Sequence, residues 1–159
     1  MNNTIDENFF KQDPNQSTLN LEKIASMLRE AGVPEFFAEE LFRYTTGEPL
    51  LVHYFLGQYN KRADTMMALK KQVTELYDSA FVFESLDELK LLAASSHLEK
   101  IPYPLMASLS YTFKQSIFRL NQKAKEFKMH YEEKGNYQWY PFFKDYLTQS
   151  IEKTFCEQE

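Results

Sequence analysis

The sequence has little glycine, little cysteine and few β-branched aliphatic residues. Only four glycines, and nine valines and isoleucines together, occur in 159 residues. Strands favour β-branched residues and tight hairpins favour glycine, so this scarcity argues against a sheet-rich fold. The single cysteine, Cys156, has no second cysteine to pair with inside the chain. We therefore expect a reducing compartment, and the cytoplasm is the predicted location.

Long apolar runs and a basic leader are also missing. No stretch of 18 apolar residues occurs, and the segment from Met1 to Ser17 is polar and acidic. The sequence therefore predicts neither a membrane span nor a signal peptide. Lys and Arg total 18 against 23 Asp and Glu, which leaves a net charge of −5. This acidic balance argues against nucleic acid as a partner of the whole surface.

Aromatic residues are abundant, and apolar residues recur at helical spacing. Aromatics make up 16% of the chain, with 14 Phe and 10 Tyr. No window alternates like a strand, so we predict an all-α fold: a compact single-domain bundle of about seven helices, residues 18–159, behind a flexible polar tail, residues 1–17. The predicted helices span about 20–31, 34–45, 49–59, 62–83, 85–97, 104–134 and 139–155. The predicted core includes Leu41, Leu51, Phe55, Leu76, Leu92, Phe113, Leu120 and Tyr146.

Helix ends are marked by capping residues. Asn20 is a predicted N-cap, and Ser85 with Glu88 has the spacing of a capping box. Gly32 supplies a left-handed stop, and Pro49 suits the first position of a helix. In the tail, Ile5, Phe9 and Phe10 either form a helical turn that docks on a partner or fold back on the chain's own core.

Catalytic motifs are absent. The sequence has no Gly-rich phosphate loop, and none of its three histidines follows a Glu by three residues, as a bundle di-iron site requires. One cysteine and scattered histidines do not suffice for a zinc site. We therefore expect no catalytic, cofactor-binding or metal-ligating residue, and no enzyme activity. His53, inside the most apolar helix, serves either a ligand pocket or an ordinary structural position.

Charge is distributed in two blocks. Six acids and one base lie in residues 72–99, whereas six bases and one acid lie in residues 100–130. Four of those bases avoid the apolar stripe of their predicted helix and form a candidate basic ridge: Lys114, Arg119, Lys123 and Lys125. The ridge either docks an anionic partner or pairs with the acidic block.

The densest aromatic cluster lies at residues 137–146. Five aromatics in the seven residues 137–143 cannot all face one core from a single short helix, so we expect some to stay exposed. Exposed Trp and Tyr anchor protein interfaces. Trp139, Tyr140 and Phe143 are therefore predicted partner-binding residues, with a lid over the core as the alternative.

Two short segments resemble known families. Residues 40–51, with Thr45-Thr46-Gly47-Glu48-Pro49-Leu50, are similar to a Thr-Gly-Gly-x-Pro-Leu segment in the lid of signalling P-loop ATPases. The span from Ile24 to Phe55 resembles the helix-turn-helix of tetracycline-repressor-like regulators, which implies a DNA-binding protein with a helical sensor domain. Residues 48–55 would then be the recognition helix, yet they contain no Lys, Arg, Ser, Thr or Asn to reach DNA.

The sequence as a whole favours a non-enzymatic helical protein–protein interaction module, such as an adaptor, chaperone or assembly subunit. The expected partner is another protein or a second copy of the chain. The alternative function is a helix-turn-helix transcriptional regulator.

Overall fold

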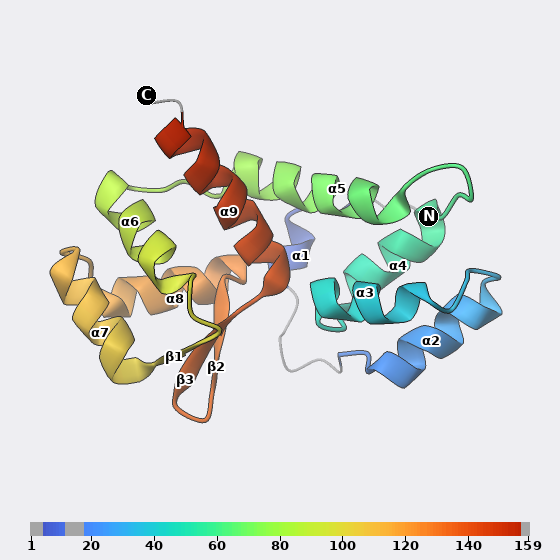
Figure 1. The fold of residues 1–159 in the computed structure, drawn as a ribbon, viewed down its shortest axis with the longest axis horizontal. Helices are drawn as coiled ribbons and strands as arrows, with labels where there is room; N and C mark the ends of the chain where they lie inside the picture. Colours follow the sequence, from blue (N-terminus) through green and yellow to red (C-terminus); the bar gives the residue numbers. More distant parts are fainter. Residues whose placement is uncertain (1–4, 12–17, 157–159) are drawn as a thin grey trace. The chain divides into compact units, whose positions relative to one another are not determined.

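The computed structural model describes residues 5–11 and 18–156 (Figure 1). The chain divides into two units, Met1–Ala80 and Phe81–Glu159, called here the N-terminal and C-terminal units. Their boundary lies inside the single helical domain that the sequence predicts. The described residues hold nine helices and three short strands, so the fold is mainly helical, as predicted. The predicted number of helices, about seven, and the predicted absence of strands were wrong.

The N-terminal unit is built of helices that pack as consecutive neighbours, from α2 on α3 to α4 on α5. Its elements are α1 (Asn8–Lys11), α2 (Leu21–Glu30), α3 (Phe37–Thr45), α4 (Pro49–Gln58) and α5 (Thr65–Ala80). Asn20 caps α2 as predicted, since its side chain accepts a hydrogen bond from the Lys23 amide at 2.7 Å. Connections of a few residues keep α2, α3 and α4 close together. The buried centre consists of Ile24, Leu28, Leu41, Leu51, Phe55, Leu69, Val73 and Tyr77.

Gly47, in the turn between α3 and α4, permits a close approach of two backbones. Its φ is +85°, and its carbonyl oxygen accepts a hydrogen bond from the Leu19 amide at 2.7 Å. A Cβ at this position would clash with the Leu19 carbonyl oxygen. Both the backbone angle and the contact therefore require glycine here. Gly47 therefore has a structural role in the turn between α3 and α4.

The C-terminal unit combines helices with a three-stranded antiparallel sheet of order β1-β3-β2 (Figure 1). Its elements are α6 (Leu86–Ser95), β1 (Lys100–Pro102), α7 (Tyr103–Thr112), α8 (Ile117–Phe127), β2 (His130–Glu133), β3 (Asn136–Trp139) and α9 (Pro141–Cys156). Half of the predicted capping box at α6 is present: the Ser85 hydroxyl accepts a hydrogen bond from the Glu88 amide at 3.1 Å, whereas Glu88 Oε1 accepts from Lys123 Nζ.

The prediction of a single helix over residues 104–134 was wrong, because α7, α8 and β2 occupy this range. Lys114 and Lys128 both adopt left-handed backbone angles, with φ of 57° and 51°, and each ends a helix. The hairpin that follows turns through Lys134 and Gly135, whose φ values of 52° and 80° are those of a two-residue type I′ turn. Residues 130–139 therefore form strands β2 and β3 instead of a helix end and a loop.

Seven of the eight predicted core residues are buried, from Leu41 at 0% exposure to Leu76 at 7%. The eighth, Phe113, is half-buried, because it lies in the turn between α7 and α8 and not inside a continuous helix.

Candidate functional site

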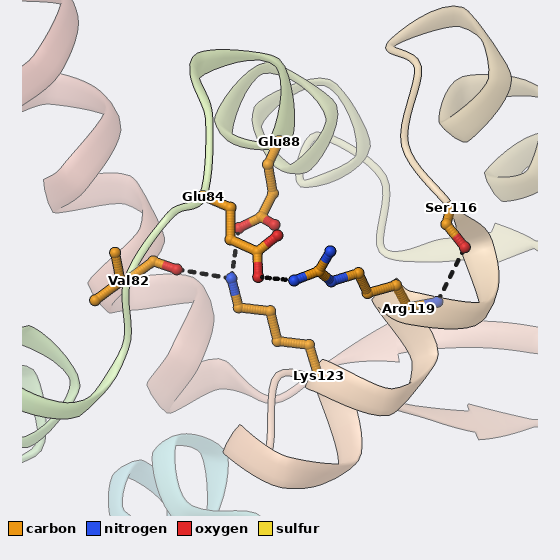
Figure 2. Close-up of polar contacts among 6 residues, drawn as sticks. All are labelled: Val82, Glu84, Glu88, Ser116, Arg119 and Lys123. Atoms are coloured by element: carbon orange, nitrogen blue, oxygen red, sulfur yellow. Dashed lines mark hydrogen bonds and ion pairs between the residues drawn. The ribbon is translucent and has the colours of Figure 1, made fainter.

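The predicted basic ridge is not one continuous exposed surface. Lys114, in the turn before α8, and Lys125, on α8, are exposed. The Lys123 side chain, on the same helix, is only 12% exposed and forms an ion pair of 2.7 Å with Glu88 on α6. Arg119 is largely exposed and pairs at 2.7 Å with Glu84 (Figure 2). Two of the four cations therefore follow the alternative prediction, which paired them with the acidic block.

Lys123 fastens α8 to the segment that leads into α6. Its Nζ donates to the Val82 carbonyl oxygen and to Glu88 Oε1, each at 2.7 Å (Figure 2). It also lies 4.4 Å from the centre of the Phe81 ring. The Glu88 side chain is 8% exposed. Separating an ion pair this well buried would leave a buried charge without a partner, which is energetically costly, so the pair stays formed. It makes α8 a fixed part of the unit.

Helices α7 and α8 form a helix-turn-helix with a four-residue connection. The Ser116 hydroxyl, in the turn, accepts from the Arg119 amide at 3.3 Å and so caps α8 (Figure 2). The turn itself is closed by the Gln115 amide, which donates to the Ser110 carbonyl oxygen at 2.7 Å. These bonds satisfy backbone groups that a helix end leaves open. They give the turn one defined conformation.

Two aromatic side chains on either side of this turn are almost fully exposed: Tyr111 at 87% and Phe118 at 71%. Along α8, exposed positions follow Phe118 at helical spacing, on the side opposite the buried Leu120 and Ala124. We define the α7–α8 face as the exposed residues Tyr111, Lys114, Phe118, Gln122 and Lys125. Its two lysines belong to the basic ridge predicted from the sequence, whereas its two aromatics were not predicted as site residues.

The predicted aromatic patch lies in a different environment from the one expected. Trp139 ends β3 at 6% exposure, Phe143 on α9 is fully buried, and the two rings stack with centres 5.8 Å apart. Tyr140 is half-buried and packs on Tyr131 with ring centres 4.9 Å apart. The expectation of exposed side chains therefore fails for Trp139 and Phe143. The hairpin explains the burial of these two residues, because Trp139 on β3 and Phe143 on α9 point into the core of the C-terminal unit.

Trp139 fluorescence should report burial. Its indole Nε1 donates to the Ser95 carbonyl oxygen at 3.5 Å inside the C-terminal unit. We expect a blue-shifted emission that added acrylamide quenches poorly, because an indole out of water has neither polar solvent nor quencher beside it. Trp139 is the only tryptophan in the chain, so the spectrum has one source. A red-shifted, readily quenched emission from the native protein would contradict this packing.

His130 is a buried histidine that the sequence analysis did not single out. It pairs with Trp139 across the hairpin, and its ring lies 4.8 Å from the Tyr137 ring and 5.3 Å from the Trp139 ring. Its Nε2 has no hydrogen-bond partner among the described residues. Burial lowers the pKa of His130 from 6.5 to about 4, because the charged imidazolium would lose its hydration.

The C-terminal unit should therefore lose stability in mild acid. The unfolded chain binds a proton at His130 near pH 6.5 and the folded chain only near pH 4. Stability contributed by neutral His130 is complete above pH 6.5 and falls as the pH drops towards 4, by roughly 3 kcal/mol. Urea unfolding followed by Trp139 emission should show a shallower pH dependence for His130→Phe. The exposed His97 offers the control His97→Gln, and equal slopes in all three proteins would contradict this assignment.

The other residues singled out from the sequence are His53 and the apolar residues of the predicted tail. His53 is exposed on α4. Within the predicted tail, residues 1–4 and 12–17 lie outside the described residues, whereas Phe9 on α1 is buried and Phe10 packs on Tyr77, with ring centres 5.2 Å apart. Phe9 and Phe10 thus fold back on the N-terminal unit, the second of the two predicted alternatives.

An open hollow of about 550 Å³ lies between α1 and α5 in the N-terminal unit. Asp6, Glu7 and Glu75 contribute to its polar walls. In residues 5–11 and 18–156, no group of three or more His, Cys, Asp or Glu side chains is arranged to hold a metal ion. Over the same ranges, no helix is both long and apolar enough to cross a membrane. No protein-family model, curated protein or solved structure matches this chain.

Proposed function

We propose that the protein is a non-enzymatic interaction module of the cytoplasm, an adaptor, chaperone or assembly subunit that binds another protein. The observation that carries this proposal is the exposure of Tyr111 and Phe118, at 87% and 71%, on the helix-turn-helix of α7 and α8. Burying one such side chain against a partner stabilises a complex by about 1.5–3 kcal/mol. Aromatic anchors of this kind dominate the energetics of protein interfaces. The proposed cytoplasmic location rests on the single cysteine in 159 residues.

The arrangement of the described residues supports a binding role over an enzymatic one. The three histidines lie on different elements or connections: His53 on α4, His97 after α6 and His130 on β2. The hollow between α1 and α5 is open and polar, whereas small-molecule sites are usually enclosed and mainly apolar. The chemistry offered by the described residues therefore suits surface recognition.

Co-purification of the tagged protein from its own cell tests the proposal. We expect a defined partner protein, or a second copy of the chain, to remain bound through size-exclusion chromatography. The double variant Tyr111→Ser/Phe118→Ser should release it, because each change removes an exposed anchor. Recovery of the chain as a folded monomer alone, from wild-type cells, would contradict the proposal.

A DNA-binding regulator is the second candidate, and the topology of the C-terminal unit favours it. The order α6-β1-α7-α8-β2-β3, with sheet order β1-β3-β2, is that of a winged helix-turn-helix. The helix corresponding to a recognition helix is α8 and not residues 48–55, whose helix α4 buries Leu51, Val52 and Phe55. Arg119, Gln122 and Lys125 on α8 have the side-chain chemistry to contact phosphates or bases.

Charge weighs against this second candidate. Glu132 and Glu133 are exposed on the hairpin beside α8, where DNA phosphates would approach. Electrophoresis with random duplex DNA at low salt separates the two functions. Retardation that Lys125→Glu abolishes would favour the regulator, whereas free DNA at all protein concentrations would favour the protein-binding module.

A further inference from the structure

We propose that the α7–α8 face binds an acidic segment of another protein that carries an aromatic or aliphatic anchor. This inference rests on the proposed protein-binding function and names the chemistry of the partner. Its elements are two exposed aromatics on α7 and α8, exposed cations on the turn and on α8, and the hydrogen bonds and ion pair that hold these helices.

The frame is preformed. Ser116 caps α8, the Gln115 amide closes the turn, and Lys123 is bonded at 2.7 Å to both Val82 and Glu88. A surface that is ordered before binding loses little conformational entropy on binding. Phe118, one residue into α8, is therefore presented on a fixed support, unlike an aromatic side chain on a mobile loop.

The cations around the aromatics call for an acidic partner. Lys114 precedes Phe118 by four residues and Lys125 follows it by seven, and both are exposed. Arg119 adds a third cation, because its pair with Glu84 joins side chains that are 69% and 44% exposed. An ion pair so open to water contributes little, so Arg119 can exchange Glu84 for a carboxylate of the partner. Glu126 is the one acid within α8.

An acidic protein fits this face better than a nucleic acid. Tight duplex binding commonly uses about six to ten phosphate contacts, whereas the face and Arg119 together offer three exposed cations. Two large exposed aromatics with few charges suit a short acidic segment that has its own apolar anchor. The opposite charges would speed and orient the encounter, and contact between the aromatic side chains and the anchor would supply most of the affinity.

Defined polymers test this chemistry directly. The probes are a labelled random copolymer of glutamate and tyrosine, polyglutamate of the same length, and short duplex DNA of random sequence. We expect the full-length protein to bind the copolymer most tightly, and its affinity to fall as salt rises. Phe118→Ser and Lys125→Glu should each weaken copolymer binding by about tenfold or more.

Phe36 provides a matched control, since it is 76% exposed in the N-terminal unit. Phe36→Ser should leave copolymer binding unchanged, and the Trp139 emission of every variant checks that the C-terminal unit stays folded. Equal binding of polyglutamate and copolymer, indifference to Phe118→Ser, or tighter binding of DNA through the same residues would each overturn the inference. If a partner still co-purifies after such a result, the proposed function stands and only the acidic chemistry fails.

Discussion

Replacing Lys123 with alanine should lower the free energy of unfolding of the C-terminal unit by about 3–5 kcal/mol. The substitution leaves Glu88, whose side chain is 8% exposed, as a buried carboxylate without its cation. It also deprives the Val82 carbonyl oxygen of a donor at 2.7 Å and the Phe81 ring of the ammonium group above it. Urea unfolding followed by the emission of Trp139, which lies in the same unit, measures this loss.

Two further variants separate the buried pair from general effects of losing a lysine. Lys125→Ala removes an exposed lysine two residues away on the same helix, and we expect a change within about 0.5 kcal/mol. The double variant Lys123→Met/Glu88→Leu should recover most of the loss, since apolar replacements of a buried pair are often neutral or stabilising. Equal effects of Lys123→Ala and Lys125→Ala would show that α8 is not fastened in this way.

Truncating Phe55 to alanine should destabilise the N-terminal unit by about 3–5 kcal/mol. Phe55 is fully buried on α4, and its ring lies 5.6 Å from that of Phe37 on α3 and 6.2 Å from that of Tyr59. Removing the ring leaves a cavity that these neighbours cannot fill without losing their own contacts. Far-UV circular dichroism during urea unfolding measures the change, because this unit holds no tryptophan.

The exposed Phe36 again gives a matched control. Phe36→Ala removes the same atoms from a position in contact with water, so its effect should stay within about 0.5 kcal/mol. A Phe55→Ala protein that unfolds at the same urea concentration as the parent would mean that α4 is not central to the N-terminal unit.

Local signals predicted the helix termini well. Asn20 and Ser85 cap α2 and α6 through their own side chains, as their spacing indicated. These bonds join residues three positions apart, so the sequence alone contains all the information they need. The consecutive packing of α2, α3 and α4 has a similarly local cause, since connections of a few residues keep adjacent helices close together.

The C-terminal unit was harder to predict because its structure depends on distant pairings. Ile101 on β1 pairs with Tyr137 on β3, and no local pattern reveals that register. Lys114 and Lys128 take left-handed angles that lysine rarely adopts, so neither marked a helix end in the sequence. Gly135 within alternating aromatic and polar residues was the signal that could have indicated the hairpin.

In the candidate site, too, features set by the local sequence were predicted and features set by distant contacts were not. Helical spacing placed Lys123 and Lys125 among exposed cations, but the partner of Lys123 is Glu88, 35 residues away in the sequence. The choice between a buried and an exposed lysine is made by tertiary structure. The sequence pattern likewise did not mark Tyr111 and Phe118, which are 87% and 71% exposed, as candidate residues.

Amide hydrogen exchange on the complex with the co-purified partner tests the central claim, that the α7–α8 face is where this protein binds another protein. Backbone amides that an interface covers, or whose local opening it suppresses, exchange more slowly than in the free chain. We predict slower exchange in residues 110–126, with the N-terminal unit unchanged around the exposed Phe36. Protection confined to residues outside α7, its turn and α8 would contradict the account.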